Sequence, residues 1–422
     1  MKSNQQSSQV DLIIVGAGMV GVTLATALAP SGMRILVLEQ RAGDLSAFGM
    51  SVRDQQEAGF DPRVSALTCA SQQILTAVGA WEVMQSYRMS PYTEMDVWDG
   101  EGTGHIHFSA RELHEPVLGH IVENRVTLAG LYSVLLQHEN VQLMTGVEVK
   151  AVNGEAMKTV TLSNGTVVQT SLVVAADGAL SKTRQMAGVP MLEWDYGHHA
   201  IVTTVKTEQP HLKTAWQRFT DDGPLALLPL KSDDGDHYCS IVWSTSPAHA
   251  KALMALDSEA FCEALGQAFE WRLGKILHSD TRAVFPLRQR HAKYYVKSGF
   301  AAVGDAAHTI HPLAGQGVNL GLLDAAQLAE TLIAAYKRGE DIGALRVLQR
   351  YQRVRQSENI KMSAAMEGFK RLFNEQQPIV RLARNMGMNL LDRMKPLKNH
   401  IVMDAMGLSG NLPEIAQRPI QE

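Results

Sequence analysis

Residues 12–39 place three glycines at fixed spacing between two apolar runs, and this arrangement restricts the fold more than any other feature. Residues 12–15 contain no polar side chain, as expected for a strand covered on both faces. The spacing Gly16-x-Gly18-x-x-Gly21 then predicts a tight turn into a helix over 19–29, and residues 35–39 predict a second strand. Together they predict a βαβ unit that opens a Rossmann-like α/β domain.

Each part of this unit has a role in binding a dinucleotide. The first glycine permits the tight turn, the second lets the backbone approach a pyrophosphate, and the third lets the helix pack closely on the sheet. The helix N-terminus presents free N–H groups and a partial positive charge to the phosphates. Glu39 closes the second strand and can accept hydrogen bonds from ribose hydroxyls. The unit therefore predicts a dinucleotide without identifying it.

Two later segments favour a flavin. Asp177-Gly178 and Gly304-Asp305 each follow a buried strand, at the edge where ligands bind in parallel sheets. Asp305 can accept hydrogen bonds from the hydroxyls of a ribityl chain. Residues 312–319 (PLAGQGVN) then lead into an amphipathic helix. The N–H groups at its start would stabilise the negative charge that develops around N1 and the C2 carbonyl of a reduced flavin.

These segments together resemble the three-part signature of the single-component flavin aromatic hydroxylases, the superfamily of para-hydroxybenzoate hydroxylase. The resemblance implies tightly held FAD, NAD(P)H as electron donor and oxygen transfer through a flavin C4a-hydroperoxide, but no catalytic side chain is assigned. It also matches Arg63 and Arg125 to arginines on the cofactor side. The cofactor-binding residues expected on these grounds are Gly16, Gly18, Gly21, Glu39, Arg63, Arg125, Asp177, Gly178, Gly304, Asp305, Pro312, Gly315, Gly317, Val318 and Asn319.

A narrower resemblance covers essentially the whole chain. Residues 119–124 (GHIVEN), 285–287 (FPL) and 304–321 are similar to the ubiquinone-biosynthesis hydroxylases of proteobacteria. Residues 194–200 (WDYGHHA) are most similar to the 2-polyprenylphenol 6-hydroxylases, which oxidise ring carbon 5 in quinone numbering. The resemblance implies a polyprenylated phenol and O₂ as substrates, and it allows other ubiquinone-biosynthesis proteins as partners.

The rest of the chain predicts a large insert and a helical end. Residues 91–110 and 198–286 carry alternating and β-branched runs separated by turn signals such as Asp222-Gly223-Pro224. We therefore expect an α/β protein with an inserted, mostly antiparallel β-sheet substrate domain and a helical C-terminus. The expected boundaries are 1–90, 111–190 and 287–345 for a discontinuous FAD-binding domain, 91–110 and 191–286 for the substrate domain, and 346–422 for the helical region.

Composition narrows the class of protein further. A net charge of −4 with 19% charged residues gives no nucleic-acid footprint. Cys69, Cys239 and Cys262 match neither a metal spacing nor a redox pair, which predicts reduced cytoplasmic thiols. The apolar run 12–29 has the length of a membrane span, but its glycine spacing and the single lysine before it favour a buried strand and helix.

Two features leave alternatives open. His308 and His311 are three residues apart, as in some metal sites, but the flavin-side loop favours hydrogen bonding and packing, so no metal is expected. Residues 361–400 hold eight Lys or Arg and three Asp or Glu, with methionine and phenylalanine between them. This segment predicts either a basic amphipathic surface for the inner membrane or a partner, or helices packed on the core with a solvated basic face.

The function also has competing interpretations. A hydroxylase for another ring position or another aromatic substrate would carry the same motifs. So would a non-hydroxylating FAD oxidoreductase, such as a prenyl reductase, or a non-catalytic flavin-binding subunit of an assembly. A flavin halogenase is disfavoured because no WxWxIP-like segment is present. Visible absorbance and oxygen-dependent turnover of a phenol would separate these possibilities.

Overall fold

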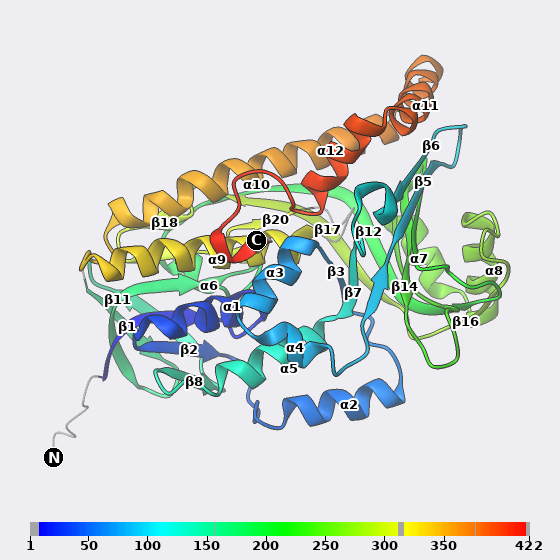
Figure 1. The fold of residues 1–422 in the computed structure, drawn as a ribbon. Helices are drawn as coiled ribbons and strands as arrows, with labels where there is room; N and C mark the ends of the chain where they lie inside the picture. Colours follow the sequence, from blue (N-terminus) through cyan, green and yellow to red (C-terminus); the bar gives the residue numbers. More distant parts are fainter. Residues whose placement is uncertain (1–7, 156, 311–315, 376, 419–422) are drawn as a thin grey trace.

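The computed structural model describes residues 8–155, 157–310, 316–375 and 377–418. Two large sheets stand side by side, and a long C-terminal helix crosses from one to the other (Figure 1). Strand and helix order agree with an α/β domain interrupted by a mostly antiparallel insert and followed by helices, so the predicted fold class is confirmed.

The first sheet is the dinucleotide-binding sheet. Its central strand β1 (Ser8–Val15) pairs in parallel with β2 (Ile35–Glu39) and β11 (Val167–Ala175). Leu12 and Ile14 enter one apolar cluster while Ile13 enters another, because successive side chains point to opposite faces. The other strands of this sheet are β8 (Val141–Thr145), β9 (Val149–Asn153), β10 (Lys158–Leu162), β18 (Val296–Lys297) and β19 (Phe300–Ala302).

Helices cover one face of this sheet. The glycine turn leads into α1 (Met19–Leu28), which packs against α5 (Asn124–Leu135) and α9 (Gln316–Lys337). The run 12–29 is therefore a buried strand and helix, as predicted. Among the described residues, α9 is the one helix with the length and hydropathy of a membrane span, and 72% of that stretch is buried within the protein.

The second sheet is antiparallel except where β13 (Thr214–Thr220) pairs in parallel with β5 (Glu94–Asp99). Strand β17 (Ala283–Ala292) runs across the boundary expected at 286, and the domain limits remain predictions. The other strands of this sheet are β6 (His105–Ser109), β12 (Met191–Thr207), β14 (Gly223–Leu230), β15 (Tyr238–Thr245), β16 (Ile276–Ser279) and β20 (His308–Thr309).

Two helices inside the insert were not expected from its sequence. Helices α7 (Pro247–Ala255) and α8 (Ser258–Ala268) cover one face of the second sheet, where Phe261 and Leu265 join a buried cluster with Ile201. The neighbours of Ile201 in β12, Ala200 and Val202, point to the other face, which stays open to a cavity.

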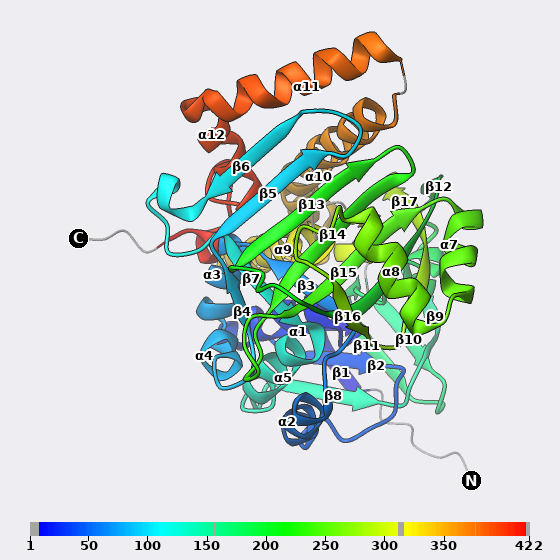
Figure 2. The ribbon, with the colours of Figure 1, turned by 90° about the vertical axis from the view of Figure 1, so that its right-hand side faces the viewer.

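Helices form most of the described C-terminal region, as expected for a helical C-terminus. Helix α10 (Leu345–Asn374) starts against α9 and ends beside the second sheet, where Phe373 stacks on Phe219 at 3.8 Å between ring centroids. Helix α11 (Pro378–Arg393) then runs along β6 at the outer edge of the sheet, and α12 (Lys395–Ala405) turns back toward the region between the sheets (Figure 2).

The remaining elements connect the two sheets. A small third sheet places β7 (Gly119–Glu123) between β3 (Val64–Leu67) and β4 (Ser90–Tyr92). The shorter helices are α2 (Phe48–Ala58), α3 (Cys69–Ala77), α4 (Ala80–Met84) and α6 (Lys182–Met186).

Candidate active site

The glycine turn after β1 is formed as its spacing predicts. Gly16 has φ +109°, and a Cβ added there would lie 2.4 Å from the carbonyl oxygen of Ala176. A Cβ at Gly21 would lie 2.0 Å from the carbonyl oxygen of Gly16. Gly18 is the N-cap residue of α1, and a Cβ there would meet nothing within 4 Å. The N-terminus of α1 therefore faces an open surface that suits a pyrophosphate.

Glu39 is fixed at the end of β2, beside this turn. Its carboxylate accepts hydrogen bonds from the amides of Ala17 at 2.9 Å and Arg41 at 2.8 Å. The hydroxyl of Tyr132 donates to the carbonyl oxygen of Ala17 at 2.7 Å. These contacts hold the acid in place, and a carboxylate has further lone pairs for ribose hydroxyls.

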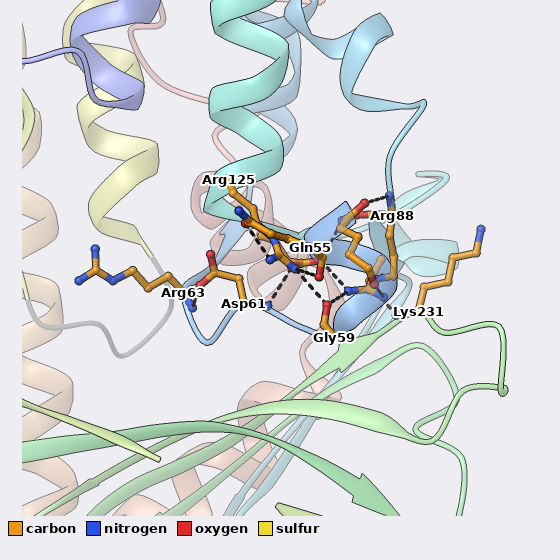
Figure 3. A network of polar contacts seen from close by, with 10 residues as sticks. Gln55, Gly59, Asp61, Arg63, Arg88, Arg125 and Lys231 are labelled. Carbon is orange, nitrogen blue, oxygen red and sulfur yellow. Dashed lines mark hydrogen bonds and ion pairs between the residues drawn. The ribbon is translucent and has the colours of Figure 1, made fainter. Parts of the chain in front are cut away.

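The two arginines of the predicted site lie in different environments (Figure 3). Arg125 is turned into the protein, where it donates to the carbonyl oxygen of Gly59 at 3.0 Å and forms an ion pair with Glu123. The exposed side chain of Arg63 extends away from this network and lines the cavity. Arg63 is thus oriented to meet a cofactor, whereas Arg125 holds the segment that follows α2.

Asp177 is engaged by the helix that follows it. Its carboxylate accepts hydrogen bonds from the hydroxyl of Ser181 and from the amide of Thr183, the latter at 3.1 Å. Gly178 has φ +84° and so allows the chain to turn between β11 and α6. In this conformation Ser181 caps α6 and Asp177 binds the first turn of this helix, and the contact of Asp177 with a cofactor remains a prediction.

A buried acid that the sequence analysis missed organises the loop after β19. Asp324, on α9, accepts hydrogen bonds from the amide of Gly304 at 3.1 Å, from His308 at 2.6 Å and from Arg355 at 2.9 Å. Although burial opposes ionisation, His308 and Arg355 hold the pKa of Asp324 below its usual range. His308 therefore hydrogen-bonds within the core, and His311 lies outside the described residues.

Asp305 follows this anchored loop and faces the cavity. Its side chain is accessible from the cavity, yet the surrounding protein desolvates it, and this burial raises the pKa of its carboxyl group. Its position at the carboxyl end of β19 suits a contact with a ribityl chain.

The start of α9 lies beside Asp305. Gln316 lines the cavity, and a Cβ at Gly317 would meet nothing within 4 Å. Val318 packs against the main core. Asn319 donates to the carbonyl oxygen of Ala66 at 2.8 Å and accepts from the hydroxyl of Ser71 at 2.7 Å, so its side chain holds the helix against β3 and α3. Pro312 and Gly315 lie outside the described residues.

The cavity has a volume of about 680 Å³ and lies between the two sheets and α12. Arg63, Thr68, Asp305 and Gln316 line it from the cofactor side. The second sheet contributes mainly apolar side chains, with Gln217, Ser240 and Ser244 among them. The further lining residues are Pro62, Val64, Ala66, Tyr92, Met95, Phe108, Leu118, Ile121, Asn124, Ala200, Val202, Ala215, Pro224, Ala226, Leu228, Val242, Phe285, Leu287, Ile401, Val402, Ala405 and Met406.

Fold and site together define a class of protein. An open glycine cradle at the N-terminus of α1, a fixed acid at the end of β2 and a second acid at the end of β19 fit the pyrophosphate, ribose and ribityl groups of FAD. The apolar cavity beside them fits an organic substrate that reacts next to the flavin ring. This arrangement is that of an FAD-dependent oxidoreductase with a separate substrate domain.

Comparison with known proteins narrows the class. The sequence matches the FAD binding domain family over residues 9–361. It is 38% identical to 3-demethoxyubiquinol 3-hydroxylase of Escherichia coli (strain K12), across 94% of this chain and 98% of that protein. It is 35% identical to ubiquinone hydroxylase UbiL of Rhodospirillum rubrum, across 94% and 89%. The chain therefore belongs to the family of FAD-dependent monooxygenases that includes these ubiquinone hydroxylases, and the predictions of family, FAD and monooxygenase activity are confirmed.

Solved structures show the same fold at low sequence identity. The p-nitrophenol 4-monooxygenase PnpA of Pseudomonas putida DLL-E4 superposes with a TM-score of 0.74 at 19% identity, covering 96% of this chain and 99% of that one. PqsL of Pseudomonas aeruginosa, a probable FAD-dependent monooxygenase, superposes with a TM-score of 0.72 at 20% identity, covering 90% and 99%.

Proposed function

We propose that the protein adds one oxygen atom of O₂ to the ring of a polyprenylated phenol in ubiquinone biosynthesis, with NAD(P)H as the electron donor. The apolar cavity between Asp305 and the second sheet carries this proposal. Its volume of about 680 Å³ can hold a ring with the first part of a prenyl chain. The ubiquinone hydroxylases among its relatives support the same substrate class.

The residues of the chain position the reactants in this reaction. Bound FAD supplies electron transfer and oxygen activation. The N-terminus of α9 would stabilise negative charge on FAD bound beside it, and the apolar sheet would exclude water from the reacting ring. Among the described residues that line the cavity, the ionisable side chains are Arg63, Tyr92 and Asp305, and burial raises the pKa of Tyr92. We assign none of them as a base toward the phenol.

We further propose ring carbon 5 as the position that is hydroxylated, on the resemblance of residues 194–200 to the 2-polyprenylphenol 6-hydroxylases. The geometry does not add to this assignment, because Trp194 is 50% exposed and, within this segment, Ala200 is the residue that lines the cavity. A second candidate is the hydroxylation of 3-demethoxyubiquinol, which is favoured by the name of the relative with 38% identity.

The purified, FAD-loaded protein can test each part of the proposal. It would be supplied in turn with a 2-polyprenylphenol and with 3-demethoxyubiquinol, under ¹⁸O₂, with NADH or NADPH. We expect one labelled oxygen in the product of the first substrate, and tandem mass spectrometry would locate it on the ring. Label only in the product of 3-demethoxyubiquinol would show that the protein hydroxylates the other ring position. Flavin reduction without any label would identify a non-hydroxylating oxidoreductase, and no turnover would indicate a non-catalytic subunit.

A further inference from the structure

Helix α11 presents an apolar face to the outside of the molecule. Ile379, Leu382, Met386 and Leu390 are 81%, 62%, 63% and 59% exposed. Their spacing of three, four and four residues places them on one side of the helix, over a length of about 16 Å. Side chains of this size are rarely left in water as a continuous row, and such a row marks an interaction surface.

The opposite face of α11 fixes its orientation. Arg384 is buried and forms an ion pair with Asp99 of β5, and Met388 packs in a small core beside β6. Across Pro378–Arg393, which the structure describes throughout, the one exposed charged residue is Arg393 and none of the exposed residues is acidic. The outward face is therefore almost free of charge.

The basic residues that suggested an electrostatic surface are largely engaged elsewhere. Six of the eight Lys and Arg in 361–400 form an ion pair with an acidic side chain of the protein. Arg381, for example, pairs with Asp221, and Lys398, which is 5% exposed, pairs with Glu112 and Asp392. The pairs of α11 and α12 hold these helices against the rest of the protein, whereas Lys361 and Arg371 pair within α10. The outward face of α11 is therefore mainly apolar.

The apolar row continues from α11 to the cavity. Met394, at the junction of α11 and α12, is 44% exposed. Leu397 and Ile401 follow four residues apart on one side of α12 and are 46% and 38% exposed. Ile401 also lines the cavity, together with Ala405 one turn further on. In Figure 2, α12 joins the outer edge of the molecule, where α11 lies, to the region between the sheets. Exposed apolar side chains thus follow one another along the chain from α11 to Ile401 at the cavity, and we call them the apolar strip.

We propose that this strip, Ile379, Leu382, Met386, Leu390, Met394, Leu397 and Ile401, binds the surface of a lipid bilayer and conducts a prenyl chain from the bilayer into the cavity. The proposal rests on the proposed function, because only a substrate with a long apolar tail needs such a path. We infer a bilayer as the binding partner because the strip ends at the cavity and the polyprenyl tail of the proposed substrate lies in lipid. Binding should depend on buried apolar area and little on salt.

The test uses the FAD-loaded full-length protein and vesicles of phosphatidylcholine, with and without phosphatidylglycerol, at low and high salt. The strip variant is Ile379→Gln/Leu382→Gln/Met386→Gln/Leu390→Gln. A matched control changes four exposed apolar residues on other elements, Met50→Gln/Leu136→Gln/Leu277→Gln/Leu345→Gln. We expect the strip variant to bind vesicles about tenfold more weakly or worse, and the control to bind like the wild type.

Turnover separates this proposal from the proposed function. The strip variant should hydroxylate a tail-less phenol in solution at the wild-type rate, and it should lose activity toward a polyprenylphenol embedded in vesicles. Equal vesicle binding by both variants, or wild-type activity of the strip variant on the embedded substrate, would overturn the proposed membrane-binding role of the strip and leave the proposed function intact. A change from dimer to monomer without any vesicle binding would show that the face joins two copies. If the wild type hydroxylates neither phenol, the proposed function itself fails. A double variant, Leu382→Gln/Leu390→Gln, serves if the quadruple variant loses FAD.

Discussion

Among the three glycines of the turn, Gly18 is the one at which a substitution should affect cofactor binding but not the fold. Gly16 and Gly21 are required by the backbone itself, because a Cβ at either position would collide with a carbonyl oxygen. Gly18 has an extended conformation with φ −73° and ψ 177°, which valine adopts readily, and open space in front of it. A pyrophosphate bound at this turn would occupy that space, so a side chain at this position should affect cofactor binding more than folding.

We therefore expect Gly18→Val to fold and to bind FAD at least about tenfold more weakly, which corresponds to about 1.4 kcal/mol of lost binding free energy. The measurement is FAD content after gel filtration, with circular dichroism to confirm folding. Gly368→Val is the matched control, because Gly368 is exposed on α10 and also has nothing within 4 Å of its Cβ position. A folded Gly18→Val protein with full FAD content would contradict the assignment of this turn to the cofactor.

Asp324 is the residue whose loss should most disturb the loop after β19, which carries Asp305. Asp324→Asn would leave Arg355 buried without a charged partner, which should cost about 3–5 kcal/mol of the free energy of unfolding. The folded-state pKa of Asp324 is depressed, so its stabilising effect is present at any pH above the unfolded value of about 4 and disappears as pH falls through the lower folded value. The Tm difference between variant and wild type should therefore be constant from about pH 6 to 8.

The roles of single residues were only partly predictable from the sequence. Spacing identified Gly16, Gly18 and Gly21 because the chemistry of the turn is local. Asp324 was missed, although an acid in the apolar stretch of α9 was a visible signal of a buried pair. Its partners His308 and Arg355 come from a loop and from α10, and only the folded chain brings them together.

The N-terminus of helix α9 should influence the reduction potential of the flavin. Gln316, the first described residue of this helix, lines the cavity, so the N–H groups of the first turn would stabilise negative charge on a reduced flavin bound beside it. Gly317→Pro would remove one of these groups, and proline is tolerated in the first turn of a helix. We expect a potential of the two-electron flavin couple more negative by roughly 5–20 mV, from a helix-terminus effect of about 0.3–1 kcal/mol, and slower flavin reduction.

Gly317→Ala provides the control for this helix terminus, because it keeps the N–H and its Cβ meets nothing within 4 Å. Its potential should match that of the wild type. Equilibrium reduction with a reference dye, followed at the flavin absorbance, would measure both variants. An unchanged potential in a folded, FAD-loaded Gly317→Pro protein would contradict the argument.

Helices and strands were predicted well where the sequence carried the signals of a single type of secondary structure. Residues 12–15, 19–29 and 35–39 form β1, α1 and β2 nearly as expected. Helices α7 and α8 were missed because residues 198–286 were interpreted as one sheet from their β-branched runs. Their signals were present: Asp257 caps α8 by accepting from the amide of Ala260 at 2.8 Å, and Phe261 and Leu265 follow at helical spacing.

The cavity exists only at the level of the whole molecule. Arg63 reaches it from the first domain, Val202 from the second sheet and Val402 from the C-terminal helices. Segments so far apart in sequence have no local pattern that predicts their contact, so the sequence indicated a substrate sheet but not the helical wall opposite it. Helix α12, which forms this wall, is held by its own contacts, such as Lys398 with Glu112, and by the docking of α11 that precedes it.

The ion pair between Arg384 and Asp99 tests this docking, because both side chains are almost fully buried, at 1% and 2% exposure. Arg384→Met should destabilise the attachment of α11 by about 3–5 kcal/mol, since it leaves the Asp99 carboxylate buried and unpaired. Limited proteolysis should then cut near α11 first, and a tailed phenol should bind more weakly while FAD stays bound. The double variant Arg384→Met/Asp99→Asn removes both charges and should recover much of the loss. Equal resistance to protease in wild type and Arg384→Met would show that apolar contacts such as Phe219 with Phe373 hold the C-terminal helices without this pair.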